Sequence, residues 1–160
     1  MTKNNLFEAF REDHAVLGKG FHDLSQALRA GDDAAAEAAA SALDRSAGAH
    51  IAFEEEDFYP VLGRLLGAPQ ARGMAREHLA GLEVIRALVP PSGRGTLDAK
   101  ARERLLRQSQ AMETHVAECG ELFEAMGRIP REEQAALHRR LLAWREKRPR
   151  WTDYADSRAA

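Results

Sequence analysis

The sequence contains an imperfect internal repeat, and each copy has two histidines at nearly the same spacing. His14 and His50 are 36 residues apart, and His78 and His115 are 37 residues apart. The stretch DHAVL around His14 resembles EHLAGL around His78, and HIAFEEEDFYP from His50 aligns with HVAECGELFEA from His115. Repetition at a fixed period indicates that one structural unit occurs twice. The repeat therefore predicts a duplicated helical hairpin.

The apolar residues predict that the chain is all-α. In the first segment Leu6, Phe10, Leu17 and Phe21 recur at helical spacing, and no segment shows the alternation of a strand. Proline, glycine and aspartate mark where helices start and stop. We expect helices over 5–30, 33–66, 70–89, 98–126 and 130–147. Because a proline inside a helix loses one backbone hydrogen bond, Pro60 should kink the second one.

Four long helices with mostly short connections predict an up-down-up-down four-helix bundle with an additional C-terminal helix. A chain of 160 residues has the size of one compact domain. We expect the bundle to cover residues 1–128. Residues 129–160 should form the extra helix and a polar tail, either packed on the bundle or extending from it. In that tail only Trp151 and Tyr154 are expected to dock.

Composition and charge exclude several classes of protein. With 44% hydrophobic and 30% charged residues, the chain can form a packed core and is not disordered. A formal net charge of −2 does not favour nucleic acid as a partner, although the fifth helix is basic. No apolar stretch is long enough to predict a membrane span. The single cysteine, Cys119, fits a reducing compartment, so we expect a cytoplasmic protein that could form a homodimer.

The four repeated histidines, one on each long helix, predict a metal site. His14 and His50 lie 17 and 19 residues from the expected turn at Gly31, which places both about 26–28 Å from it at 1.5 Å per residue. Glu54 follows His50 by four residues, so both side chains lie on one face of the helix. Imidazole and carboxylate donors together suit iron, manganese or zinc better than calcium or magnesium.

At these positions the sequence resembles the hemerythrin-like family of HHE cation-binding domains. The family pattern, H…HxxxE…H…HxxxE on four helices, covers about residues 8–126. The resemblance implies a non-haem di-iron centre whose ligands are His14, His50, Glu54, His78 and His115, with Glu54 as a bridging carboxylate. Oxygen-carrying hemerythrins have a further histidine where this chain has Leu82. That difference favours the bacterial and iron-sensing branch of the family over a dedicated oxygen carrier.

The second bridging carboxylate of the family pattern is missing, because Cys119 stands at its position. Three interpretations follow. Glu118, one residue earlier, could replace the carboxylate. Cys119 could bind the metal as a thiolate or act as a redox-active thiol. Otherwise the second carboxylate is absent, which would leave a mononuclear, partly loaded or zinc-filled site.

Some neighbouring residues could contribute to the site. Tyr59 could donate a hydrogen bond or bind the metal, and Glu55 could reach the edge of the site. Asp13 and Glu77 each precede an expected ligand and should point elsewhere. His22, eight residues after His14, should be a surface residue or lie just outside the ligands.

The resulting functional expectation is a protein that binds or senses dioxygen, nitric oxide or peroxide at a non-haem iron site. A small di-iron oxidoreductase that removes peroxide or nitric oxide is the first alternative, and a protein that stores or donates iron is another. A metal-free bundle that acts through its surface is the remaining one.

Overall fold

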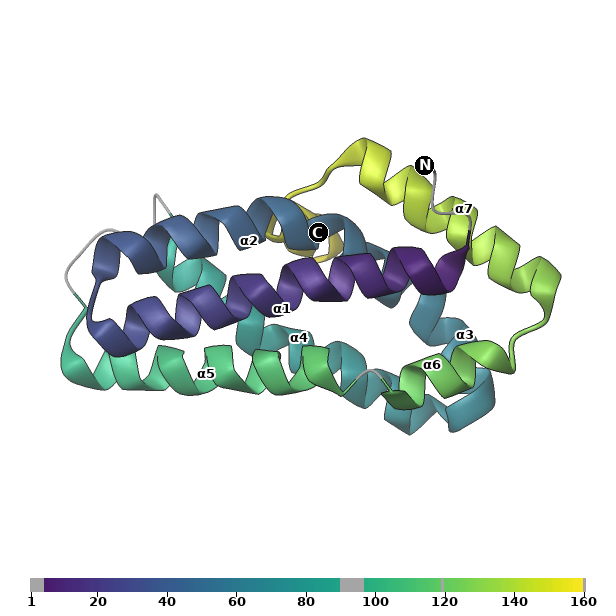
Figure 1. The fold of residues 1–160 in the computed structure, drawn as a ribbon, viewed down its shortest axis with the longest axis horizontal. Helices are drawn as coiled ribbons and strands as arrows, with labels where there is room; N and C mark the ends of the chain where they lie inside the picture. Colours follow the sequence, from purple (N-terminus) through teal and green to yellow (C-terminus); the bar gives the residue numbers. More distant parts are fainter. Residues whose placement is uncertain (1–4, 90–96, 119, 160) are drawn as a thin grey trace.

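The computed structural model describes residues 5–89, 97–118 and 120–159, and it confirms an all-α bundle (Figure 1). The helix α1 packs against α2 and α5, and α4 packs against the same two helices, so the four form a closed ring. No strand occurs in the described ranges. The bounds of these four helices are Leu6–Ala30 for α1, Asp33–Phe53 for α2, Ala68–Leu88 for α4 and Ala99–Ala117 for α5.

Capping residues explain where the first hairpin turns. The side chain of Asn5 accepts a hydrogen bond from the backbone N–H of Glu8 at the start of α1. Gly31 ends that helix in the left-handed conformation (φ 69°), which glycine adopts without steric cost. Asp32 then caps α2 by accepting from the N–H of Ala35. A connection this short makes α1 and α2 antiparallel neighbours.

The second helical segment contains a π-helical turn where the sequence predicted only a kink. The helix α2 is followed without a break by the π-helix η1 (Glu54–Phe58) and then by α3 (Tyr59–Leu66). Pro60 lies in the first turn of α3, where its missing N–H is tolerated. The N–H of Tyr59 donates to the carbonyl of Glu54, five residues earlier. The wider turn thus absorbs the disruption caused by the proline, and it begins at an expected metal ligand.

The expected fourth helix, 98–126, is divided into two helices. The helix α5 ends at Ala117, and Glu118 leaves the helical conformation with ψ 46°. A separate helix, α6, covers Gly120–Gly127. Glycine is a poor residue for a helix interior, so Gly120 favours the division at this point.

The expectation of a loose tail was wrong. After α7 (Arg131–Lys147) the chain forms another helix, α8 (Trp151–Ala159), which packs on α2 and α4. The side chains of Trp151 and Tyr154 are buried on it. The carboxylate of Asp44 on α2 accepts hydrogen bonds from both the backbone N–H and the hydroxyl of Thr152. The burial of Trp151 and Tyr154 was expected, whereas the helix that carries them was not.

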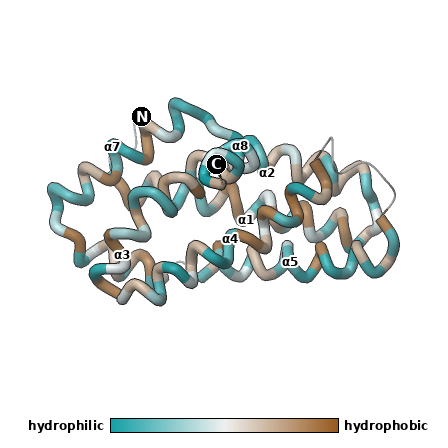
Figure 2. The backbone as a smooth tube through the Cα atoms, turned by 180° about the vertical axis from the view of Figure 1, so that it is seen from behind, coloured by the Kyte–Doolittle hydropathy of each residue, from teal (hydrophilic) through white to brown (hydrophobic). Residues whose placement is uncertain are grey.

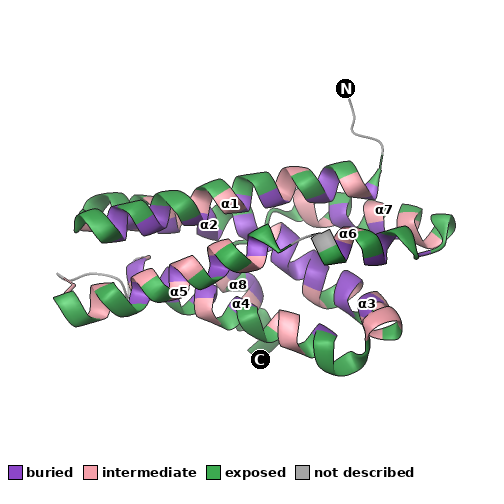
Figure 3. Cartoon of the chain, turned by 60° about the horizontal axis from the view of Figure 1, so that its bottom comes forward, coloured by how far each residue is buried: buried purple, intermediate pink, exposed green. Residues whose placement is uncertain are grey.

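The helices are amphipathic, and their apolar faces form two buried clusters. Hydrophobic and hydrophilic residues alternate along the chain in Figure 2, and the buried residues in Figure 3 lie mainly toward the inside of the bundle. One apolar cluster includes Leu24, Leu43 and Ile85, and the other includes Phe10, Phe53 and Phe58. In the described part of the chain no helix combines the length and the apolar character that crossing a membrane requires.

Replacing Gly48 by alanine is expected to destabilise the docking of α8. A Cβ atom at Gly48 would overlap the carbonyl oxygen of Pro149, whose backbone crosses α2 at this position. We expect the free energy of unfolding to fall by about 1–3 kcal/mol, as in other overpacked cores, measured by urea denaturation. Gly73→Ala is the control, because a Cβ there meets no atom within 4 Å. Wild-type stability in the Gly48 variant would contradict this packing.

Candidate metal centre

The four repeated histidines meet in the interior of the bundle around one glutamate. The ring centroids of His14 and His50 are 4.9 Å apart, and those of His78 and His115 are 5.1 Å apart. The Oε1 atom of Glu54 lies 3.3 Å from Nε2 of His50 and 3.6 Å from Nε2 of His78. The structure therefore places the histidines of all four helices at a common level.

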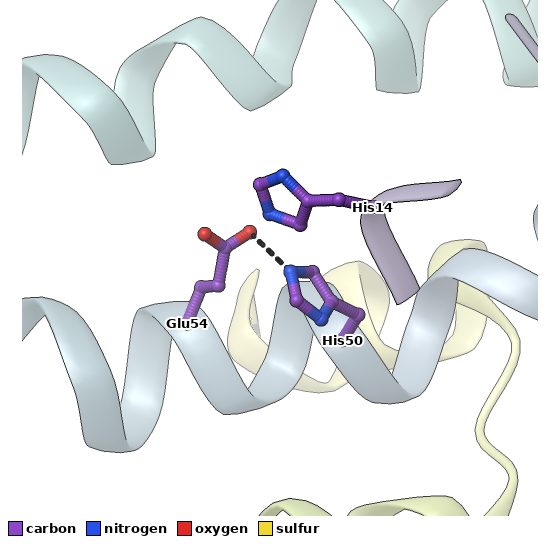
Figure 4. A group of neighbouring side chains, drawn as sticks. All are labelled: His14, His50 and Glu54. Atoms are coloured by element: carbon purple, nitrogen blue, oxygen red, sulfur yellow. Dashed lines mark ion pairs between the residues drawn. The ribbon is translucent and has the colours of Figure 1, made fainter. Parts of the chain in front are cut away.

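These five residues form two groups that share Glu54. In the group of His14, His50 and Glu54, one ligand atom from each residue lies within 4.8 Å of the others, and the same holds for Glu54, His78 and His115. Figure 4 shows the first group, in which both imidazole rings turn a nitrogen toward the carboxylate. Each group consists of two imidazoles and one carboxylate.

The five residues of the centre are largely shielded from solvent. His14, His50, Glu54 and His78 are all buried. His115 is the most open of the five, with 12% of its side chain exposed. The ring of Phe10 lies 4.2 Å from the His14 ring and closes the first group on its apolar side. Electrostatic interactions between the ligands are therefore strong, because little water screens them.

Every imidazole uses its Nδ1 atom to contact a group outside the centre. The Nδ1 of His14 lies 3.2 Å from the backbone carbonyl of Val116. The other three Nδ1 atoms donate to carboxylates: His50 to Asp13 at 2.8 Å, His78 to Glu55 at 2.8 Å, and His115 to Glu77. A proton held on Nδ1 leaves the lone pair of a neutral ring on Nε2, which is the arrangement that metal-binding histidines commonly have.

The expectation that Asp13 and Glu77 point elsewhere was wrong. Each of them precedes the first histidine of one hairpin and binds the second histidine of the same hairpin. Asp13 contacts His50, and Glu77 contacts His115. An acidic residue directly before the first histidine in both copies of the repeat was the signal in the sequence. By contrast, His22 lies on the surface, where it contacts Glu113.

The surroundings raise the pKa of His50 and His78 and lower that of His14. Burial lowers the pKa of His50, but the carboxylates of Glu54 and Asp13 outweigh this effect and raise it to about 9. Burial likewise opposes the charge on His78, and the hydrogen bonds to Glu54 and Glu55 raise its pKa to about 9. Burial and the charge of His50 lower the pKa of His14 to about 4.

Two neighbouring histidines keep the carboxyl group of Glu54 ionised. Although burial alone would raise the pKa of this carboxyl, the cationic His50 and His78 hold it well below its ordinary value. The hydroxyl of Tyr59 donates to Oε2 of Glu54 at 2.9 Å and also lies 3.2 Å from Nε2 of His78. Burial and the charge of Glu54 raise the pKa of Tyr59 well above its usual range. Tyr59 is therefore a hydrogen-bond donor to the shared carboxylate.

The structure does not bring Glu118 into either group. Glu118 is exposed at the end of α5, where it lines an open cavity of about 670 Å³ with Glu77, His115 and Glu121. Cys119 lies outside the described residues. Among the described residues, the carboxylates that contact the second pair besides Glu54 are Glu55 and Glu77, and both bind the Nδ1 side of their histidine.

The donor set fits a transition-metal ion. The Nε2 of His50 is buried and makes no hydrogen bond in the described structure, but it forms an ion pair with Oε1 of Glu54, 3.3 Å away. In the neutral ring this nitrogen would offer its lone pair to a metal ion. Nitrogen donors from two imidazoles with one carboxylate are typical of iron, manganese and zinc sites.

Comparison with known proteins agrees with this geometry. The family described as the hemerythrin HHE cation binding domain matches residues 5–126, a range that contains all five residues of the two groups. Neither the search of curated proteins nor the search of solved structures gives a match. Since the family match covers more than half of the chain, the protein belongs to the hemerythrin HHE cation-binding domain family.

Proposed function

We propose that this protein binds non-haem iron and uses it to bind or sense dioxygen, nitric oxide or peroxide. His14 and His50 would hold one iron ion, His78 and His115 would hold another, and Glu54 would lie between them. The observation that carries the proposal is the position of Glu54, whose carboxylate belongs to both histidine pairs. When bound, iron supplies redox chemistry and coordination positions that the protein leaves open.

The number of donors supports a reactive site over a closed structural one. Each group offers two imidazoles and one carboxylate, which is fewer than the four ligands of a closed tetrahedral site. Two histidines and one carboxylate with open positions are also typical of non-haem iron in proteins that react with oxygen. Phe10 and the buried faces of the helices limit water at the first pair.

The cavity beside His115 supports access for a small molecule. It has a volume of about 670 Å³, and its lining includes His115 together with Met74 and Leu122. His115 is the most open of the five residues, so a diatomic molecule or peroxide would reach the centre from the side of the second pair.

Tyr59 favours a small di-iron oxidoreductase as the second candidate function. Its hydroxyl is buried and lies within hydrogen-bonding distance of both Glu54 and His78. A phenol in this place can hold a proton at Oη beside the shared carboxylate, as a reduction of peroxide or nitric oxide with electrons from an external reductant would require. Turnover of either substrate above that of free iron, lost in Tyr59→Phe, would favour this candidate.

Anaerobic loading with ferrous iron tests the proposed function. We expect one iron per histidine pair by metal analysis. Exposure to air should give near-ultraviolet absorption that changes when azide or nitric oxide is added. His14→Ala should lose iron, while the control His22→Ala, which changes an exposed histidine on the same helix, should load as the wild type does. Equal loading of both variants, or no iron in the wild type, would contradict the proposal.

A further inference from the structure

Two arginines from the C-terminal helices contact carboxylates that bind the histidines. Arg145 on α7 donates to Oδ1 of Asp13 at 2.8 Å, and Arg158 on α8 donates to Oε1 of Glu55 at 3.0 Å. Both arginines follow the range 5–126 that matches the family. The C-terminal helices thus reach the surroundings of the metal centre from outside the family domain.

The two contacts have the same form. Asp13 uses one carboxylate oxygen for Arg145 and the other, Oδ2, for Nδ1 of His50. Glu55 uses one oxygen for Arg158 and the other, Oε2, for Nδ1 of His78. Each series of hydrogen bonds runs from an arginine through a carboxylate to an imidazole, and the two series end at different histidine pairs.

We infer that α7 and α8 contribute to metal binding. Arg145 and Arg158 on these helices are positioning residues for His50 and His78. The inference rests on the proposed metal binding. A guanidinium fixes the orientation of a carboxylate through directed, charge-assisted hydrogen bonds. The carboxylate in turn fixes the rotation of the imidazole and keeps the proton on Nδ1, so that Nε2 points to the metal.

The burial of the groups indicates which contact matters more. Arg145 is 31% exposed and also donates to the carbonyl of Ala9, so it is held from two sides. Arg158 is 49% exposed and shares its guanidinium with the hydroxyl of Tyr154. Since exposed ion pairs contribute little, we expect the larger effect from Arg145.

The C-terminal helices have other anchors, so the arginines can be removed singly. Trp151 is buried against α1 and α4, with its ring 6.2 Å from that of Phe21 and close to Gly81. The indole of Trp144 donates to Asp57 at 2.8 Å. These contacts do not involve Arg145 or Arg158, and we expect the helices to stay docked in either variant.

Titration of the metal-free full chain with Co²⁺, in competition with a chelator, tests the inference. Removal of a group that orients a metal ligand typically weakens metal affinity about 10–100-fold. We expect about 10-fold weaker binding at one of the two sites in Arg145→Ala, a smaller loss in Arg158→Ala, and a changed visible Co²⁺ spectrum in both. Arg140→Ala is the matched control, because Arg140 is also on α7 and contacts Asp57, which binds no histidine of the centre.

A double variant separates positioning from general stability. If Arg145 acts through Asp13, then Arg145→Ala should weaken Co²⁺ binding in the wild type but have no further effect in an Asp13→Ala background. Arg145→Lys, which keeps the charge, should recover part of the affinity. Wild-type affinity and spectrum in both single alanine variants, or an equal loss in Arg140→Ala, would overturn the inference. Absence of Co²⁺ binding in the wild type would instead overturn the proposed function.

Discussion

Glu54→Gln is expected to remove metal binding at both histidine pairs. Glu54 is the one residue of the described chain that belongs to both groups of candidate ligands. Glutamine keeps the shape of the side chain but has no negative charge, and a neutral amide is a much weaker ligand than a carboxylate. We expect the iron content after loading and dialysis to fall to a small fraction of the wild-type value.

Two other variants show whether this effect belongs to the shared position. Glu56→Gln changes a carboxylate in the same π-helical turn that contacts Tyr154 and Arg158 but no histidine of the centre, so it should load as the wild type does. His115→Ala should reduce loading at the second pair and leave the first pair occupied. If Glu54→Gln kept iron at either pair, the shared role of this carboxylate would be wrong.

Much of the centre could be predicted from the sequence because helix geometry is regular. The short turn at Gly31 and the constant rise per residue determine the heights of His14 and His50, and the rings indeed lie side by side. The spacing of four residues between His50 and Glu54 determines a common face in the same way. The repeat extends the argument to His78 and His115, whose ring centroids lie 5.1 Å apart.

Features that depend on tertiary structure could not be predicted in this way. The contact from Asp13 to His50 joins two helices, so the repeated acid before the first histidine marks Asp13 but does not show which imidazole it contacts. The π-helical turn at Glu54 depends on how the chain accommodates Pro60 within a packed helix. The helix α8 is stabilised by the burial of Trp151, while its own sequence is polar and shorter than isolated helices that are stable in water.

The second large effect is a loss of stability of the metal-free protein as the pH rises from about 6.5 to 9. His50 and His78 have a pKa of about 9 in the folded protein, compared with 6.5 as their ordinary value. Below 6.5 both are protonated in the folded and unfolded states, and their ion pairs stabilise the fold fully. Between 6.5 and 9 the folded state holds protons that the unfolded state has lost, so the stabilisation decreases with increasing pH.

The size of this effect follows from the number of protons retained. Each histidine contributes up to about 1.4 kcal/mol per pH unit within its range, and because His50 and His78 share Glu54 the two contributions are coupled and not additive. Urea denaturation of chelator-treated protein at pH 6.5 and 8.5 measures the difference. Glu54→Gln should flatten the dependence, because the carboxylate that both histidines share is gone. A stability that stays constant or increases over this range would contradict the charge assignment.

His14 determines how the stability of the metal-free protein changes below pH 6.5. Its pKa of about 4 means that the folded state resists a proton that the unfolded state accepts below pH 6.5, so stability should also fall between pH 6.5 and 4. The metal-free protein should therefore be most stable near pH 6.5. Metal binding has the opposite dependence above this value, because a metal ion competes with the protons on His50 and His78. The stabilisation by added metal should consequently increase from pH 6.5 to 8.5, while the stability of the metal-free protein decreases.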